Sequence, residues 1–312
     1  MRGKSIWEIA KEAANGWMEH NVSRLAAAVA FYTIFSLAPV LLIALAIAGA
    51  IMGEASARLE LADQLRFYMG PRSSEFILLV LEGTRADGGT ALATVLASTT
   101  ALLGATAAFA QLQDALNTIW EVQPKSGSWL KGLIYSRLFS FLMVLVIGAI
   151  LLLSLLLTAS LSAVNEFVGN VWPIPPVLVA LVNLAVSFLI TTVLFATVYK
   201  VLPDAQISWK DVWVGAAITS VLFTGGKALI GLYLGGSSLR SVYGAAGSLV
   251  MILLWVYYST HILFFGAELT QAYARRFGNE IRPKPFSERI PWGRLRRSRV
   301  QNSGEAEPDD RT

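Results

Sequence analysis

The chain has 312 residues, of which 55% are hydrophobic and 15% are charged, and its formal net charge is +4. A soluble protein of this length needs more charged residues to cover its surface, so this composition favours a membrane protein over a soluble globular fold. Cysteine is absent, which excludes disulfides, thiolate metal sites and cysteine nucleophiles.

Six long runs of apolar residues follow one another along the chain. A helix rises about 1.5 Å per residue, so about 20 apolar residues cross a bilayer core that is roughly 30 Å thick. We therefore predict an all-α polytopic membrane protein with a six-helix transmembrane domain over residues 25–270. The predicted spans are 25–53, 90–113, 138–164, 177–199, 212–234 and 243–267.

Three segments lie outside these spans. Residues 1–24 have the pattern of an amphipathic helix, which either lies at the cytoplasmic membrane surface or packs on the cytoplasmic loops. The loop at 54–89 contains two helical patterns and is predicted to lie at the outer interface. Residues 276–312 are rich in Arg, Pro and Ser and then acidic, so we predict a disordered cytoplasmic tail. Its basic cluster either contacts anionic lipid or serves only as a charge anchor.

The distribution of basic residues predicts the orientation. Nineteen of the 25 lysine and arginine residues fall in the two terminal segments and the loops on their side of the membrane, and five fall on the other side. Because positively charged loops stay in the cytoplasm, both termini are predicted to be cytoplasmic. This asymmetry accounts for the positive net charge, so no nucleic-acid partner is expected.

Lys227 is the clearest candidate for a functional group inside the membrane, because it interrupts the fifth apolar run. It either extends its ammonium group to the outer membrane surface or binds a substrate, headgroup or ion. Asn183 in the fourth span and Pro39 in the first span are expected at a similar depth. Pro39 cannot donate a hydrogen bond to the Phe35 carbonyl, which frees a polar group in the membrane. We therefore predict a site formed by Lys227, Asn183, Phe35 and Pro39.

A second polar group follows the second span. Gln111, Asp114 and Asn117 recur every three residues and are predicted to form one polar stripe. The stripe is either an inner gate or ion site, or the surface of a helix that leaves the membrane and pairs with basic loop residues.

In the sixth span, His261 and Glu268 are seven residues apart and are expected to face the same side. They form either a titrating pair or two separate interfacial groups.

Several runs resemble the YihY/BrkB family of membrane proteins. They are Ala-Phe-Tyr-Thr-Ile-Phe-Ser-Leu-Ala-Pro at 30–39, Gln-Leu-Gln-Asp-Ala-Leu-Asn-Thr-Ile-Trp at 111–120, Leu-Pro-Asp at 202–204, and the segments at 243–250, 255–259 and 265–270. The resemblance covers roughly residues 10–278. It implies a bacterial inner-membrane protein with six helices, in a family linked to serum resistance and to envelope or solute export.

Some members of that family carry the older name ribonuclease BN, which raises an enzymatic hypothesis. A nuclease needs a metal cluster or a close acid–base pair, yet the chain has only two histidines and no spacing typical of metal ligands. A Gly-x-x-x-x-Gly-Lys phosphate loop is also absent. We therefore expect no enzyme activity, no metal and no cofactor.

Two functions remain open from the sequence. The first is transport, export or flipping of a lipid-like or small zwitterionic substrate between an outer site at Lys227 and an inner site at Asp114. The second is a membrane scaffold for envelope integrity, in which the polar groups only fix helix packing. Membrane lipids are the expected partners in both. Glycines in the fifth span allow close packing within the chain or with a second copy, so an oligomer is compatible with the sequence.

Overall fold

The computed structural model describes residues 2–69, 107–125, 175–236, 247–278 and 281–290, together with residues 74, 75, 77–79, 149, 150 and 153. This part of the chain is predominantly helical, as the sequence predicts. Its helices are α1 (Arg2–Glu19), α2 (Val22–Met52), α3 (Glu54–Met69), a helix at 107–119, α7 (Pro176–Val201), α8 (Trp209–Gly236) and α10 (Gly247–Phe277).

Three of the described helices are long and apolar enough to cross a membrane. They comprise Val177–Val201, Trp209–Ile230 and Leu249–Phe277, which correspond to the predicted spans 177–199, 212–234 and 243–267. All but the last residue of the predicted span 25–53 lies in α2, a single helix of 31 residues that ends at Met52. The predicted spans 90–113 and 138–164 lie mostly outside the described residues.

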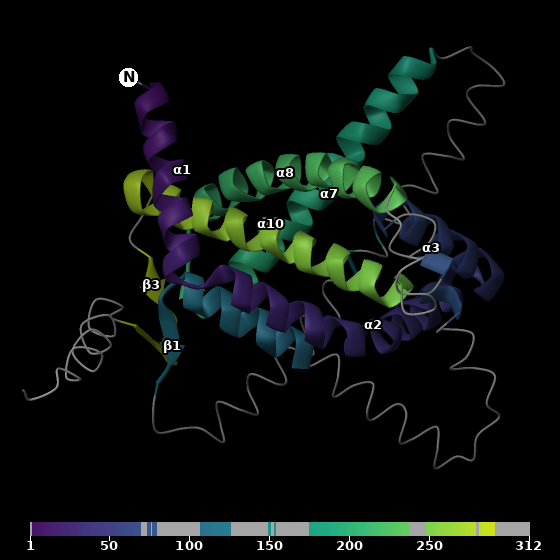
Figure 1. Cartoon of the computed structure of the whole chain (residues 1–312), viewed down its shortest axis with the longest axis horizontal. Coiled ribbons are helices and arrows are strands. Elements are labelled where there is room, and N and C mark those ends of the chain that lie inside the picture. Colours follow the sequence, from purple (N-terminus) through teal and green to yellow (C-terminus); the bar gives the residue numbers. More distant parts are fainter. Residues whose placement is uncertain are drawn as a thin grey trace, which may run out of the picture.

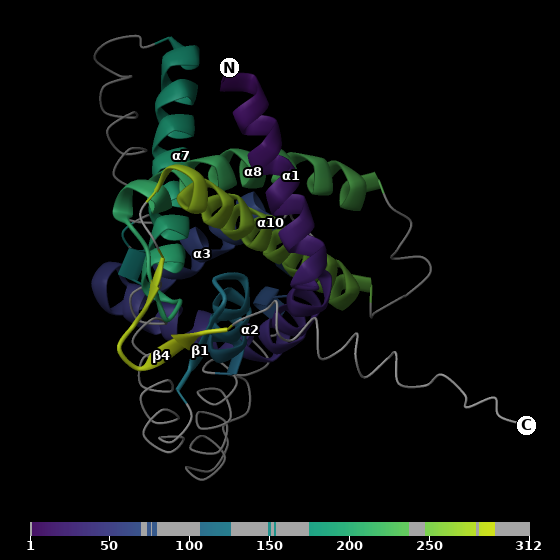
Figure 2. The same ribbon diagram turned by 90° about the vertical axis from the view of Figure 1, so that its left-hand side faces the viewer.

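The long helices form a bundle in which α10 packs against both α8 and α2 (Figures 1 and 2). The helix α7 packs on α8, and its N-terminal half then extends away from the bundle (Figure 1). At one end of the bundle, α1 crosses α10, and the strands β1 and β3 lie beside it. At the other end, α3 packs back on α2.

Two residues in left-handed or glycine-favoured conformations separate the first three helices. Asn21 has a φ of 53° between α1 and α2, and Gly53 has a φ of 86° between α2 and α3. Asparagine and glycine adopt positive φ more readily than other residues, so both helix ends have a local cause. The two turns place α1 and α3 at opposite ends of α2.

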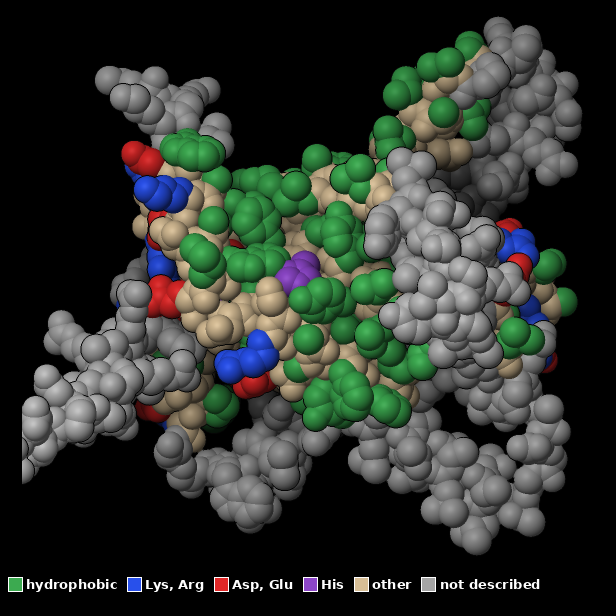
Figure 3. Space-filling model, viewed as in Figure 1, with side chains coloured by type: hydrophobic (Ala, Val, Ile, Leu, Met, Phe, Trp, Pro, Cys, Tyr) green, Lys and Arg blue, Asp and Glu red, His purple; other side chains and the backbone are tan. Residues whose placement is uncertain are grey.

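The surface of the bundle has an apolar band between two charged ends (Figure 3). Charged side chains gather around α1 at one end and around α3 at the other, while hydrophobic side chains cover the helices between them. Large apolar side chains on this surface are exposed, among them Val177, Leu181, Leu189, Val221 and Leu229. Such a band suits a lipid environment, where exposed apolar groups carry no hydration cost.

The main core lies toward the end of the bundle that carries α1. Trp120, Tyr199, Leu202 and Phe264 are fully buried there and join the end of the helix at 107–119 to α7 and α10. Close packing of α8 on α10 depends on two glycines. A Cβ on Gly215 would overlap the Thr270 side chain, and a Cβ on Gly266 would overlap Thr219 and the Tyr199 hydroxyl.

Within the described residues, four short strands depart from the predicted all-α fold. They are β1 (Val122–Pro124), β2 (Ala205–Gln206), β3 (Arg282–Pro283) and β4 (Ser287–Arg289). Antiparallel pairing joins β1 to β4 and β2 to β3. The prediction of disorder over 276–312 is therefore wrong for residues 281–290, where backbone groups pair with two other loops. Residues 291–312, including the basic cluster, lie outside the described part of the chain.

Candidate functional site

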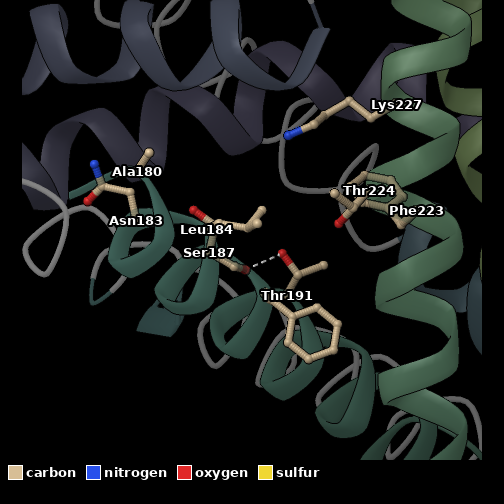
Figure 4. A pocket seen from close by; sticks show the side chains of 9 residues that line it. Ala180, Asn183, Leu184, Ser187, Thr191, Phe223, Thr224 and Lys227 are labelled. Atoms are coloured by element: carbon tan, nitrogen blue, oxygen red, sulfur yellow. Dashed lines mark hydrogen bonds between the residues drawn. The ribbon is translucent and has the colours of Figure 1, made fainter. Parts of the chain in front are cut away.

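A pocket lies between α7 and α8 where these two helices diverge (Figure 4). Its volume is about 250 Å³. Both helices contribute residues to its lining, which comprises Ala180, Asn183, Leu184, Ser187, Phe188, Thr191, Phe223, Thr224 and Lys227. Just beyond the pocket, the helices meet through a buried hydrogen bond of 3.0 Å from the Thr192 hydroxyl to the Ser220 hydroxyl. The pocket thus lies next to the point where α7 and α8 are in contact, on the side where the two helices separate.

Lys227 and Asn183 face the pocket from different helices. The half-buried Lys227 side chain extends from α8 toward α7, and the exposed Asn183 lies on the α7 side of the pocket (Figure 4). The sequence predicts these two residues as parts of one site, and the structure places both in one lining. Their role in binding stays a prediction.

Two threonine hydroxyls add polar groups to the lining. Thr191 donates to the Ser187 carbonyl over 2.8 Å, and Thr224 donates to the Ser220 carbonyl over 2.8 Å. Because each hydroxyl proton is used within its own helix, the hydroxyl oxygen presents its remaining lone pair as an acceptor. The lining therefore combines strong donors on Lys227 and Asn183 with weaker acceptors.

The described residues that line the pocket have a positive formal charge. Lys227 is the single ionisable side chain among the nine residues that line it, and the remaining eight are apolar or neutral polar. A cationic group in an apolar surrounding favours a ligand with a negative charge or a strong acceptor.

Phe35 and Pro39 do not share this lining in the described structure. Phe35 is 63% exposed, and its ring contacts Phe31 at 5.0 Å between centroids. Both residues lie on α2, which packs against α10, whereas the pocket lies on the α7 side of α8. The prediction that Phe35 joins Lys227 is therefore wrong. Pro39 lies within α2, but its side chain is outside the described residues.

The predicted stripe of Gln111, Asp114 and Asn117 does not act as one group. Asp114 is exposed, whereas Asn117 is buried, and the buried glutamine on the same face is Gln113. Residues three apart differ by about 60° around a helix, so Gln111 and Asn117 are separated by about 120°, whereas residues four apart stay within about 40°. The prediction therefore grouped Asn117 with Gln111 and Asp114, whereas the buried polar residue beside it is Gln113, four residues away.

Asn117 instead binds Asp204 in the loop between α7 and α8. Its amide donates to the Asp204 carboxylate over 2.9 Å, and its side-chain oxygen accepts the Asp204 backbone N–H over 2.7 Å. Gln113 also donates to this carboxylate, over 3.3 Å. The sequence contained a signal for this contact, because Leu202-Pro203-Asp204 is a run that combines a proline with an acidic residue between two spans.

The segment at 281–290 closes over the same loop. The Ser287 hydroxyl and the Lys284 backbone N–H both donate to the Asp204 carbonyl, over 2.7 and 2.9 Å. The Lys284 ammonium reaches the Val201 carbonyl at 3.2 Å. Burial lowers the pKa of Lys284, while the Asp204 carboxylate raises it and the Lys200 ammonium lowers it further. Asp204 thus joins three segments that are distant in sequence.

Glu268 pairs with His20 rather than with His261. His20 Nδ1 lies 2.7 Å from Glu268 Oε1, and both side chains are buried. Glu268 also faces Gly16, where a Cβ would overlap its carboxylate. The predicted pair of His261 and Glu268 is wrong because residues seven apart on one helix are separated by about 10 Å along its axis. The partner comes from the turn between α1 and α2, a contact that helical periodicity within one span does not reveal.

His261 belongs to an aromatic cluster. Its ring stacks on the Trp17 ring with 4.8 Å between centroids, and it meets the Tyr257 ring edge-on with 4.3 Å between centroids. Nearby, Arg275 binds Glu121 at 2.7 Å, and Arg276 forms an ion pair with Glu8. The Trp17–His261 stack and the Arg276–Glu8 pair join α1 to α10, whereas the Arg275–Glu121 pair joins α10 to the end of the helix at 107–119.

Comparison with protein families gives a match over most of the chain. The family described as "Virulence factor BrkB" matches residues 13–291. Curated relatives are named as UPF0761 membrane proteins. One from Nitrosospira multiformis is 27% identical over 277 residues, which cover 86% of this chain and 61% of the relative.

Two further relatives show how the lengths compare. One from Ralstonia nicotianae is 29% identical and covers 80% of this chain and 55% of its own length. One from Alteromonas mediterranea is 26% identical and covers 84% of this chain and 86% of its own length. The chain thus spans less than two thirds of the Nitrosospira and Ralstonia relatives. No solved structure matches it.

Proposed function

Because the chain belongs to the Virulence factor BrkB family of membrane proteins, we propose that it moves an envelope-related substrate across the bacterial inner membrane by transport, export or flipping. The substrate is lipid-like or a small polar or zwitterionic molecule. Its binding site is the pocket between α7 and α8. No enzymatic step and no cofactor are part of this proposal.

The observation that carries the proposal is the position of Lys227 in the lining of a pocket within an apolar span. A charged side chain inside a membrane is costly, and it usually faces a cavity or a partner that has a function. The pocket also faces the crossing of two helices that diverge, so a small change in their angle changes its size. A protein that only fixes helix packing does not require a polar pocket at this position.

We also propose six spans with both termini in the cytoplasm. Support comes from the charge asymmetry of the sequence and from the location of α1 and the strands together at one end of the bundle (Figure 1). With this orientation, the pocket lies toward the outer membrane surface, and the Asp204 loop lies at the cytoplasmic surface. Between the two polar regions, α7 and α8 are in contact through the buried Thr192–Ser220 hydrogen bond.

Transport is testable in vesicles that contain the purified protein. Phospholipids with a fluorescent headgroup or acyl label report flipping when a membrane-impermeant reductant bleaches the outer leaflet, and glycine betaine reports uptake of a small zwitterion. We expect the wild-type protein to accelerate at least one of these processes. Lys227→Met and Asn183→Ala should lower the rate by about tenfold or more, which corresponds to about 1.4 kcal/mol in the barrier.

A matched control is Lys210→Met, which removes an exposed lysine from the same helix outside the pocket. This variant should retain the wild-type rate. If wild type moves none of the probes, or if Lys227→Met and Lys210→Met have equal rates, the pocket is not a transport site. The results would then favour the scaffold function over transport.

A further inference from the structure

The groups that line the α7–α8 pocket define the chemistry of a ligand. The Lys227 ammonium and the Asn183 amide are donors, and the described residues of the lining include no carboxylate. Lysine binds phosphate as a compact positive charge, and neutral amides complete the coordination of phosphate oxygens. The Thr191 and Thr224 hydroxyl oxygens accept hydrogen bonds, so they suit a hydroxyl group next to the phosphate.

The depth of the pocket matches the headgroup region of one leaflet. Lys227 lies three residues before the end of the apolar stretch Trp209–Ile230, and Asn183 lies six residues after the start of Val177–Val201. Trp209 and Trp213 are exposed at the opposite end of α8, as expected for residues at a membrane interface. Lys227 is about 27 Å from Trp209 along the helix, so it lies near the far boundary of a core roughly 30 Å thick.

The mouth of the pocket faces the apolar surface of the bundle. Exposed apolar side chains continue from the pocket toward the middle of the membrane on both helices. They are Leu184 on α7, which also lines the pocket, and Val221 on α8. A molecule with a polar end in the pocket would therefore place its other end against an apolar surface.

The volume limits how much of a ligand fits inside. At about 30 Å³ per water molecule, a pocket of about 250 Å³ corresponds to about eight waters. Pockets that enclose a drug-sized molecule are usually larger, roughly 300–1,000 Å³. The pocket therefore suits a polar headgroup but is too small for its acyl chains.

From charge, depth, mouth and volume together, we propose that this pocket binds the phosphate-bearing headgroup of an anionic phospholipid such as phosphatidylglycerol. Lys227 and Asn183 hold the phosphate, and the acyl chains lie on the exposed faces of α7 and α8. With both termini cytoplasmic, the lipid belongs to the outer leaflet. The inference rests on the proposed function only in taking this pocket as the substrate site.

Native mass spectrometry of the full chain in detergent tests the inference directly. The probes are phosphatidylglycerol, diacylglycerol with the same acyl chains, glycerol 3-phosphate and inorganic phosphate. We expect wild type to bind phosphatidylglycerol at least tenfold more tightly than diacylglycerol. Lys227→Met should abolish this preference, Lys227→Arg should largely restore it, and the control Lys210→Met should leave it unchanged.

Three results would overturn the inference. These are equal binding of diacylglycerol and phosphatidylglycerol, a preference that Lys227→Met does not change, or soluble glycerol 3-phosphate or phosphate binding as tightly as the lipid. The last result would identify a soluble anion as the ligand. A thermal unfolding curve with the wild-type midpoint verifies that each variant is folded.

The same variants separate this inference from the proposed function. Lys227-dependent phospholipid binding without movement of any vesicle probe would retain the lipid site and reject transport. Movement of a zwitterion that depends on Lys227, without preference for a phosphate headgroup, would retain transport and reject the lipid site.

Discussion

At the scale of single residues, the buried pair of His20 and Glu268 is a contact that the sequence does not predict, because the two residues are 248 positions apart. Glu268 is 1% exposed and His20 is 4% exposed, so neither side chain has access to solvent. Their contact connects the α1–α2 turn to α10, while Gly16 leaves space for the carboxylate. Removing one member leaves the other buried without its partner, which is costly in a protein interior.

We predict that Glu268→Ala lowers the free energy of unfolding by about 3 kcal/mol or more, whereas the double variant His20→Ala/Glu268→Ala loses less than the sum of the single changes. Denaturant titration in detergent micelles measures these values. The control is Glu8→Gln at the exposed Arg276–Glu8 pair, which joins α1 to α10, and this change should cost less than about 1 kcal/mol. Additive effects in the double variant would show that the two side chains do not interact.

At the scale of elements, the segment at 281–290 joins two loops, one that follows the helix at 107–119 and one that connects α7 to α8. Its strand β4 pairs with β1, which follows the helix at 107–119, and its strand β3 pairs with β2 in the loop between α7 and α8. Asn117 and Asp204 lie where these segments meet. Movement of one loop is therefore linked to movement of the other through backbone hydrogen bonds as well as side chains.

Asn117→Ala should loosen this junction, because it leaves the Asp204 N–H without its side-chain acceptor and weakens the hold on its carboxylate. We expect a loss of about 1–3 kcal/mol. We also expect faster hydrogen exchange at the Lys284 and Ile290 amides, which donate to Asp204 and Glu121 carbonyls. Asp114→Asn changes an exposed side chain on the same helix and should alter neither quantity. A larger effect of Asp114→Asn than of Asn117→Ala would favour the predicted stripe over the observed junction.

At the scale of the whole molecule, the sequence predicted those features that depend on local composition. Apolar length located the helices that contain Asn183 and Lys227, and the depth estimate for both residues placed them within reach of one pocket. Features that depend on packing between segments could not be predicted in this way. His20 reaches Glu268, and Ser287 reaches Asp204, only because helix crossings bring distant segments together. The expected depth of Pro39 and the Phe35 carbonyl that it frees predict Phe35 at the pocket, but α2 packs on α10 and not on the α7 side of α8.

Orientation is a property of the whole chain, and the absence of cysteine makes it directly measurable. The helix α2 has 31 residues and a length of about 46 Å, enough to connect α1 at one membrane surface with α3 at the other. Lys11 on α1, Lys210 at the start of α8 and Arg58 on α3 are all exposed. Single cysteines at these positions therefore report on both ends of the bundle.

We predict that a membrane-impermeant maleimide labels Arg58→Cys in intact spheroplasts, but labels Lys11→Cys and Lys210→Cys only after the membrane is permeabilised. The reason is the excess of basic residues on the side of the termini, which resist translocation during insertion. Labelling in detergent provides the control for intrinsic reactivity. If Lys11→Cys and Arg58→Cys react from the same side, α2 does not cross the membrane. If all three sides are reversed, the pocket opens to the cytoplasmic leaflet, and the lipid that it binds must be sought there.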